Sequence, residues 1–554
     1  MPSLLVFFTF LLGLFTSLAF VPPISRLAVS IGILGQTGGQ KIHTGSIPRL
    51  GGIAIFFSVL LSTLLFCSIE LDIKAYLAGG IIIFLTGLSD DLQEISPRRM
   101  FLGELIAVTV AILIGRQSLL SLGNLLGAGE LGLGAFSLPF TIVALVGVIN
   151  AVKLIDGLDG LAGGATAIAA LAFLVLAGLA GNQNIMFISA ALLGATLGFL
   201  KFNTHPAQIF MGGAGSLFLG YSLGYCAINL ALEGGGTISP VTLLIILALP
   251  IVDTIVVMAG RARSGAHFFA PDRSHLHHRL LALGFSHGMT VVLLYFLSYC
   301  FAVAALIFRN SPDYLLFYGL LAFLALLYGN IRMMEREQTI RGNLWIFSLK
   351  LPHLRLLHNP RLHRWYIYFL RSAKYLLVAV FTLTMFIPPV LSVTIGIVAG
   401  FLLALFLVVL WISKDRKSRF LHFVIYFNGA FLIYLMQNYA KDVSLFGIQL
   451  LTISDVIFGL LLLAGLALAA IRANPAAVLS TPLEYFIIFI VISVPLLPEP
   501  LRQQYDLLMI AGKSVILFFA MKLVLKPRAK RNRKIIAAAL VTLLVVVFRN
   551  VAGF

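Results

Sequence analysis

The feature that most constrains the fold is a succession of long apolar segments that recur along the whole chain. Many are about 18 or more residues long, enough to cross the hydrocarbon core of a bilayer as helices. The chain is 60% hydrophobic and 11% charged, far from the composition of a soluble domain. The runs are continuous rather than alternating, which disfavours a transmembrane β-barrel. The sequence therefore predicts an all-α, polytopic integral membrane protein with about 18 transmembrane helices.

The formal net charge of +18 reflects basic residues that gather in short segments between the apolar runs. This distribution is typical of cytoplasmic loops and therefore reports topology. It also suits anionic lipid head groups or phosphate substrates, whereas the scattering over membrane loops argues against a nucleic-acid partner. Cys67, Cys226 and Cys300 fall in or beside apolar runs, so neither a disulfide framework nor a zinc site is predicted.

The first apolar run, residues 4–21, has no basic residue before it. We interpret it as the first spanning helix rather than as a cleaved signal peptide. Because proline interrupts helices, we expect this helix to end at Pro22 and Pro23.

The most informative polar stretch is residues 150–162, which follows an apolar run and contains Asp156 and Asp159. Carboxylates beside hydrocarbon are costly and usually mark a functional site. Lys153 lies one helical turn before Asp156 and can bring a cation to the same place. If the helix continues, the two acids share a face; the glycine after each acid makes a turn equally compatible. A polar helix end at the membrane surface is the alternative without a function.

Asp90 and Asp91 end another apolar run. Two like charges this close raise the pKa of one carboxyl group or require a cation nearby. The pair could accept a proton from a nucleophile or hold a divalent metal. Taken alone, an Asp-Asp pair is more often a solvated turn.

Two glycine-containing segments carry groups that suit phosphate. Lys41, His43 and Arg49 follow the first helix and offer charge or hydrogen bonds, although a basic loop would look the same. Residues 201–216, which include Asn203, form a glycine-rich turn that opens a helix. Such a turn can bind phosphate through backbone N–H groups, or it can bring small residues of two helices together.

The most distinctive segment is the loop 261–279, which follows an apolar run containing Asp253. Arginine gives bidentate phosphate contacts and histidine gives neutral or charged donors, so the loop suits a nucleotide diphosphate. A histidine metal site is the alternative, but the arginines would repel a cation. A basic cytoplasmic loop is the third interpretation. The residues concerned are Arg261, Arg263, His275, His277, His278 and Arg279.

Together these segments resemble the motifs of the polyprenyl-phosphate N-acetylhexosamine-1-phosphate transferases, over roughly residues 1–330. The family starts the lipid-linked intermediates of bacterial envelope polysaccharides. The loop 271–279 is more similar to the branch that uses UDP-N-acetylglucosamine-like sugars than to the muramyl-pentapeptide branch. The matching blocks are residues 48–52, 90–91, 150–161, 206–216, 250–254 and 271–279.

The resemblance implies a reaction and roles for the residues. A polyprenyl phosphate attacks the β-phosphate of a UDP-sugar and releases UMP, at the cytoplasmic face of the bacterial inner membrane. The catalytic residues would be Asp90, Asp91 and Asp156, with the histidine loop closing on the nucleotide. The substrate-binding residues would be Lys41, His43, Arg49, Lys153, Asp159, Asn203, Asp253, Arg261, Arg263, His275, His277, His278 and Arg279.

Three positions depart from the family pattern. Lys153 and Gly213 replace an asparagine and an aspartate that the family links to Mg²⁺, and Met100 stands where a lysine is usual. Mg²⁺ is expected of the family, but its usual ligands are missing. We hypothesise that Lys153 supplies part of the charge stabilisation that a metal gives relatives. The alternative is a catalytically inactive homologue that serves as a membrane scaffold or ligand-binding regulator; a transporter is a third option.

The rest of the chain does not share these motifs. We divide the chain into a transferase-like domain at 1–330, a basic cytoplasmic linker at 331–374 and a multi-helix membrane region of unknown role at 375–554. The strongest inside markers are residues 414–419 and 526–534. Counting back from them places the loops of Asp90, Asp156, Asn203 and His275 in the cytoplasm.

Overall fold

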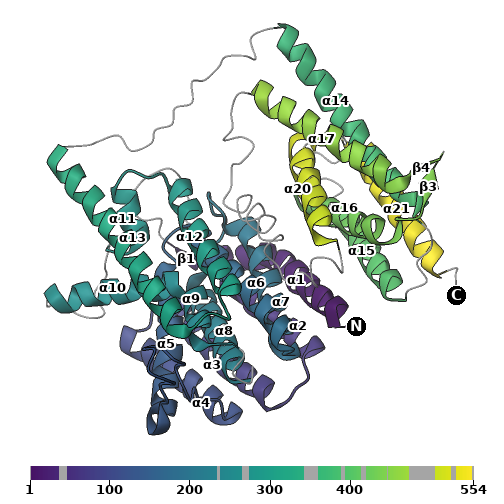
Figure 1. The fold of residues 1–554 in the computed structure, drawn as a ribbon. Helices are drawn as coiled ribbons and strands as arrows, with labels where there is room; N and C mark the ends of the chain where they lie inside the picture. Colours follow the sequence, from purple (N-terminus) through teal and green to yellow (C-terminus); the bar gives the residue numbers. More distant parts are fainter. Residues whose placement is uncertain are drawn as a thin grey trace. The chain divides into compact units, whose positions relative to one another are not determined.

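The computed structural model describes residues 2–35, 47–233, 238–264, 274–341, 360–387, 393–412, 419–445, 447–472, 506–525 and 532–551. These residues are almost wholly helical, which confirms the predicted all-α class. They form two compact units, one built from helices α1 to α13 and the other from α14 to α21 (Figure 1).

Helices of the first unit pack in pairs that carry the polar segments. Helix α1 packs against α7 and α2, α3 packs against α4 and α8, and α5 packs against α8. Two short strands, β1 (Leu34–Gly35) and β2 (Ile47–Pro48), pair antiparallel. The helices are α1 (Pro2–Ser30), α2 (Gly51–Phe66), α3 (Leu71–Gln93), α4 (Pro97–Gly115), α5 (Ser137–Ile155), α6 (Leu161–Ala180), α7 (Gln183–Asn203), α8 (Gly212–Glu233), α9 (Pro240–Ile246), α10 (Ala248–Ser264), α11 (Leu276–Ala282), α12 (His287–Ile307) and α13 (Asp313–Arg341), with a 3₁₀ turn, η1 (Gly134–Phe136).

Among the described helices, 11 are long and apolar enough to cross a membrane, or 12 if the pair α9 and α10 counts as one span. These two helices are bent by 81° relative to each other. The described residues thus confirm a polytopic helical protein, without confirming the predicted number of about 18 helices.

The predicted end of the first helix was wrong, because α1 passes through Pro22 and Pro23 and ends at Ser30. A proline removes one backbone donor but can be accommodated where a neighbouring helix holds the chain. Toward its N-terminus α1 packs closely on α7, where a Cβ on Gly194 would lie 2.2 Å from the carbonyl oxygen of Phe10.

The second unit contains six described helices and one further pair of short strands. Helices α13 and α14 both extend into the range 331–374 that the sequence suggested as a linker. The elements are α14 (Pro360–Leu383), η3 (Thr384–Phe386), α15 (Val393–Ile412), α16 (Arg419–Tyr439), β3 (Ser444–Leu445), β4 (Ile448–Gln449), α17 (Leu450–Arg472), α20 (Leu507–Val524) and α21 (Arg533–Val551).

A buried lysine joins three helices of the second unit. The ammonium of Lys513, on α20, lies 2.7 Å from the carboxylate of Asp455 on α17 and donates to the side-chain oxygen of Gln437 on α16 at 2.9 Å. Lys513 is buried, whereas half of the Asp455 side chain is exposed. Sequence reasoning found no chemistry in this half of the chain, because these residues are far apart in sequence.

Candidate active site

The acid pair Asp90 and Asp91 lies in the last turn of α3, against the start of α8. One oxygen of Asp91 accepts the backbone N–H of Gly213 at 2.7 Å, and the other accepts that of Ala214 at 2.9 Å. Gly212 permits this approach because its φ is +75°, a region that side chains rarely adopt. The first N–H groups of α8 have no partner within the helix, so they and the helix dipole stabilise the charge of Asp91.

Arg49 covers the acid pair from the segment between β2 and α2. Its Nε lies 3.2 Å from Oδ1 of Asp91, and its Nη2 lies 3.9 Å from Oδ2 of Asp90. The segment is fixed to the turn before α8, where Phe210 donates to the carbonyl of Pro48 at 2.7 Å. This pairing brings residues more than 100 positions apart in sequence to one carboxylate cluster.

The stretch 150–162 turns rather than continuing as a helix. Helix α5 ends at Ile155, and Gly160 has a φ of +81° before α6 begins. Asp156 therefore follows the last residue of α5 and does not share a helix face with Asp159. Burial and, to a smaller extent, the negative charge of Asp91 raise the pKa of Asp156 to about 7, while Arg49 opposes the rise. Asp156 thus belongs to the same electrostatic cluster as the acid pair.

Asp159 points to a different neighbourhood. Its carboxylate accepts from Nδ1 of His205 at 2.8 Å and from the backbone of Ala207 at 3.1 Å, while His287 accepts its backbone N–H at 3.2 Å. The ligand atoms of Asp159, His205 and His287 lie within 4.8 Å of one another, so they could hold a metal ion. Sequence reasoning missed both histidines, because nothing local connects them with Asp159.

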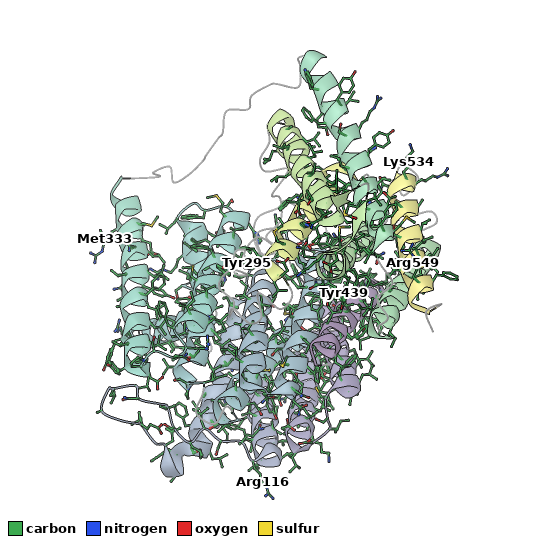
Figure 2. All side chains as sticks on the ribbon, turned by 45° about the vertical axis from the view of Figure 1, so that its right-hand side comes forward. Arg116, Tyr295, Met333, Tyr439, Lys534 and Arg549 are labelled. Carbon is green, nitrogen blue, oxygen red and sulfur yellow. The ribbon has the colours of Figure 1, made fainter. Side chains whose placement is uncertain are left out.

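The turn between Asp159 and α6 is held by buried hydrogen bonds. Asn203 accepts the backbone N–H of Gly160 at 3.0 Å and donates to the carbonyl of Ile209 at 2.9 Å. Tyr295, which lies among the helices in Figure 2, donates to the carbonyl of Gly160 at 2.6 Å. Asn203 therefore holds the turn at Gly160 and the segment at Ile209 in place.

Asp253 anchors the histidine segment. It accepts the ring N–H of His275 and the backbone N–H of Leu276, both at 2.8 Å, and the hydroxyl of Tyr328 at 3.4 Å. Asp253 and His275 are both buried. The intramembrane acid that the sequence indicated on α10 thus fixes the start of α11.

His277 is the histidine that meets the 150–162 turn. Only 2% of it is exposed, and neither ring nitrogen has a hydrogen-bond partner among the described residues. A Cβ on Gly157 would lie 2.2 Å from its Nε2, so the ring packs directly on that backbone. Burial and, to a smaller extent, the neighbouring His278 lower the pKa of His277 to about 4. His277 is therefore a neutral imidazole beside the backbone of Gly157.

The remaining basic residues of this segment have separate surroundings. Arg279 makes a two-bond ion pair with Glu335 of α13, at 2.7 and 2.8 Å, which raises its pKa. Arg261 is buried beside the pocket described next, and Arg263 is exposed. Lys41 and His43 lie outside the described residues.

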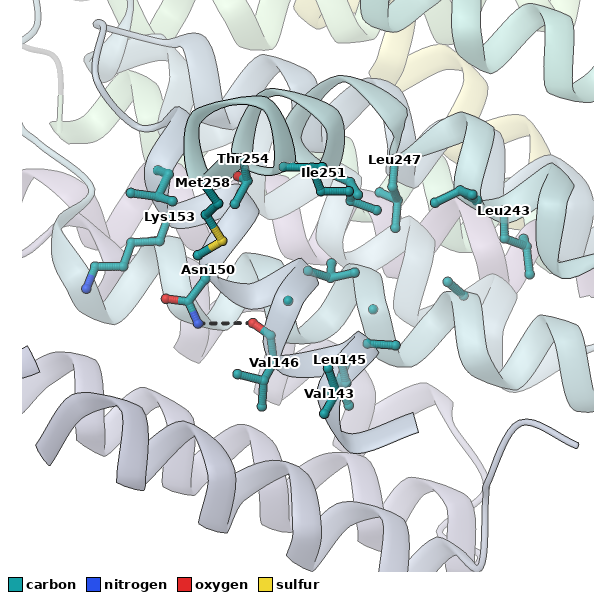
Figure 3. A pocket seen from close by; sticks show the side chains of 18 of the residues that line it. Val143, Leu145, Val146, Asn150, Lys153, Leu243, Leu247, Ile251, Thr254 and Met258 are labelled. Atoms are coloured by element: carbon teal, nitrogen blue, oxygen red, sulfur yellow. Dashed lines mark hydrogen bonds between the residues drawn. The ribbon is translucent and has the colours of Figure 1, made fainter. Parts of the chain in front are cut away.

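A large apolar pocket of about 1140 Å³ opens beside these groups. Figure 3 shows side chains of α5 and α10 lining it, with Asn150 and Lys153 toward one end and Leu243 toward the other. Gly157 and the three described histidines of the loop, His275, His277 and His278, also line it. The pocket is therefore apolar along its length and carries polar groups from the candidate site.

Lys153 does not point at the acid pair. Its ammonium contacts the sulfur of Met100 on α4, and its charge acts on the buried Glu104 one turn further along. Asn150 donates to Glu104 at 2.5 Å. The charge of Lys153 is thus shared with a carboxylate on α4.

Comparison with known proteins identifies the family of this chain. A family model described as glycosyl transferase family 4 matches residues 73–231, which include the pair Asp90 and Asp91 and the 150–162 turn. A Bacillus subtilis (strain 168) protein named probable undecaprenyl-phosphate N-acetylglucosaminyl 1-phosphate transferase is 35% identical over 308 residues, covering 55% of this chain and 86% of that protein. The chain belongs to glycosyl transferase family 4.

Two further relatives are similar over about half of the chain. Proteins named undecaprenyl-phosphate alpha-N-acetylglucosaminyl 1-phosphate transferase are 31% identical over 284 residues in Yersinia pestis and 30% identical over 274 residues in Escherichia coli (strain K12). They cover 50% and 49% of this chain, and 77% and 74% of their own lengths. The family resemblance that the sequence motifs predicted is therefore confirmed.

Proposed function

We propose that the first unit transfers an N-acetylhexosamine 1-phosphate from a UDP-sugar to polyprenyl phosphate. A phosphate oxygen of the lipid attacks the β-phosphorus of the UDP-sugar. The bond between this phosphorus and the oxygen shared with the α-phosphate breaks, and UMP leaves with that oxygen. The products are UMP and a lipid-linked diphosphate sugar, and the names of the relatives support this reaction class.

One observation carries the proposal: separate polar segments converge beside an apolar pocket. The charge of Asp91 acts on Asp156, and Gly157, the next residue, packs against His277. Gly157 and His277 line the pocket. Carboxylates, a neutral imidazole and an apolar channel thus meet, as a reaction between a nucleotide and a lipid requires.

The pocket suits the hydrocarbon part of the acceptor. An apolar ligand of this kind gains free energy from every methylene removed from water, about 0.8 kcal/mol each. The bent pair α9 and α10 forms part of the pocket wall, because side chains of both helices line it. A lipid held there would present its phosphate to the polar residues near Gly157.

Asp156 is suited to hold a proton during the reaction. A phosphate monoester has its second pKa near 6, so both it and Asp156 change protonation close to neutrality. A carboxylate with a pKa of about 7 can take the proton of the acceptor phosphate and leave the more nucleophilic dianion. His277 can donate one hydrogen bond to a phosphate oxygen while remaining neutral.

The test is turnover by purified full-length protein in detergent. UMP release is measured with undecaprenyl phosphate and a panel of UDP-N-acetylhexosamines, with and without Mg²⁺. We expect one UDP-sugar to be used, and Asp156→Asn to lower the rate at least a hundredfold. Glu130→Gln, an exposed acid in the segment between α4 and α5, is the matched control. No UMP release under any condition would exclude the transferase.

An inactive ligand-binding homologue is the second candidate, because Gly213 supplies no side chain to the acid cluster. Binding and turnover separate the two. A UDP-sugar that protects the protein against thermal unfolding without UMP release would favour this candidate.

We also propose that the site faces the cytoplasm of a bacterial inner membrane, where UDP-sugars are made. Ser89 and Ser274 are both exposed next to site residues. Single cysteines at these positions should be labelled in inverted vesicles and protected in intact cells. Labelling only from outside would remove the source of the nucleotide substrate.

A further inference from the structure

The acid pair of α3 is already surrounded by positive groups of the chain itself. Both oxygens of Asp91 accept backbone N–H groups, from Gly213 and Ala214, and one also faces Nε of Arg49. The Asp91 side chain is completely buried. Its lone pairs are therefore largely engaged before any ligand arrives.

Arg49 extends over both carboxylates. Its Nη2 lies 3.9 Å from Asp90 while its Nε lies 3.2 Å from Asp91, so one guanidinium spans the pair. The two carboxylates carry two negative charges and Arg49 carries one positive charge. The start of α8 adds roughly half a positive charge, which leaves the group close to neutral.

A divalent cation does not fit this set of groups. Mg²⁺ needs oxygen ligands in near-octahedral geometry at about 2.0–2.1 Å, and it would here meet a guanidinium that already occupies the carboxylates. Position 213 could have supplied another oxygen, because a Cβ there would lie 3.1 Å from Oδ2 of Asp90. Glycine supplies none. The Mg²⁺ expected from the family thus lacks a ligand and encounters a competing charge.

We propose that Arg49, instead of a divalent cation, supplies the positive charge at the acid cluster and binds the acceptor phosphate. The inference rests on the proposed function. A guanidinium has five N–H donors, and those of Nη1 do not face the acids in the contacts above. About a third of the Arg49 side chain is exposed, so phosphate can reach it. Arg49 would then hold together two anionic groups, as a bridging metal does elsewhere.

Metal binding tests this inference independently of activity. Free Mn²⁺ is measured by electron paramagnetic resonance while it is titrated, up to millimolar concentration, into purified protein in a non-ionic detergent. All titrations use a His205→Gln background, which removes one ligand of the separate group Asp159, His205 and His287. In that background we expect the wild-type acid cluster and Arg49→Lys, which keeps the charge, to bind no Mn²⁺ beyond the Glu130→Gln control. The double variant Gly213→Asp/Arg49→Gln should bind one ion per protein, at least tenfold tighter than either background.

The variant Gly213→Ala controls for the tight contact at this position. It introduces the same Cβ without a carboxylate, so it should fold and bind no Mn²⁺. If the double variant does not remain monodisperse, Arg49→Gln alone is the second test, because removing the guanidinium should by itself raise the affinity for Mn²⁺. Stoichiometric Mn²⁺ binding by the wild-type acid cluster at the affinity of the double variant would overturn the proposal.

Turnover gives the second readout. In excess EDTA, wild type should keep its rate of UMP release within about twofold of the rate with Mg²⁺, and Arg49→Gln should lose it. Activity that disappears in EDTA and returns with Mg²⁺ would overturn the assignment of Arg49. If no condition gives turnover, the proposed function fails, while the Mn²⁺ titration still decides whether the cluster is a metal site.

Discussion

Replacing Asp253 by alanine should release the segment that carries His277. Asp253 is the shared acceptor for the first two residues of this segment, with 2.8 Å contacts to the ring of His275 and the backbone of Leu276. Both donors are buried, at 4% and 2% exposure. The longer contact with Tyr328 adds little.

The magnitude follows from the two donors that would lose their acceptor. A buried donor left unpaired costs about 1–3 kcal/mol, so the two together predict a loss of about 2–6 kcal/mol in the free energy of unfolding. Asp253→Asn should cost only about 0.5–1.5 kcal/mol, because the amide oxygen still accepts from Leu276 and His275 can change tautomer to accept the amide N–H. The difference in unfolding free energy between the two variants measures what the hydrogen bonds to Asp253 contribute.

The assay uses the cysteines of the first unit. Cys67, Cys226 and Cys300 are free and all lie in that unit, so their reaction with a thiol dye during denaturation in mixed micelles reports its unfolding. UMP release should fall in the order wild type, Asp253→Asn, Asp253→Ala. An alanine variant within about 0.5 kcal/mol of wild type would refute the anchoring role.

Three further predictions concern other parts of the molecule. Because burial raises the pKa of Asp156 to about 7, the folded protein keeps, between about pH 4 and 7, a proton that the unfolded chain has already lost. The free energy of unfolding should therefore fall as the pH rises from about 4 to 7, and Asp156→Asn should flatten that fall in the same thiol assay. Gly52→Ala should lower the free energy of unfolding by about 1–3 kcal/mol in the same thiol assay, since its Cβ would lie 2.1 Å from the backbone nitrogen of Gly215. Lys513→Met should cost only about 1 kcal/mol in an unfolding titration followed by tryptophan fluorescence, because half of the Asp455 side chain is already exposed to solvent.

The sequence was sufficient to predict the class of fold, and it drew attention to acids that the structure places at the ends of helices. Apolar run length predicted membrane helices, and the cost of carboxylates beside hydrocarbon predicted that these acids mark a functional site. Asp90 and Asp91 do lie in the last turn of α3, and Asp156 does follow α5. For the 150–162 stretch, the two alternatives were decided in favour of a turn by the positive φ of Gly160.

Contacts between distant segments could not be predicted in the same way. His205 and His287 meet Asp159 only because α7 ends and α12 begins beside the same turn. Likewise, the sequence showed Asp253 as an intramembrane acid, but only the structure shows that it holds His275. Local patterns identify residues that are expensive to bury, whereas their partners depend on how the helices pack.

Lys153 shows where a count of charges along the sequence misleads. Relative to the family pattern, this chain gains a lysine at position 153 and lacks one at Met100. Counting charges along the sequence treats these two differences as independent. In the structure the ammonium of Lys153 contacts the sulfur of Met100 and acts on Glu104. A lysine at either position can therefore bring its charge to the same region between α4 and α5, and the two departures are one exchange. Gly213 is then the departure that changes the acid cluster, which is why the charge balance there depends on Arg49.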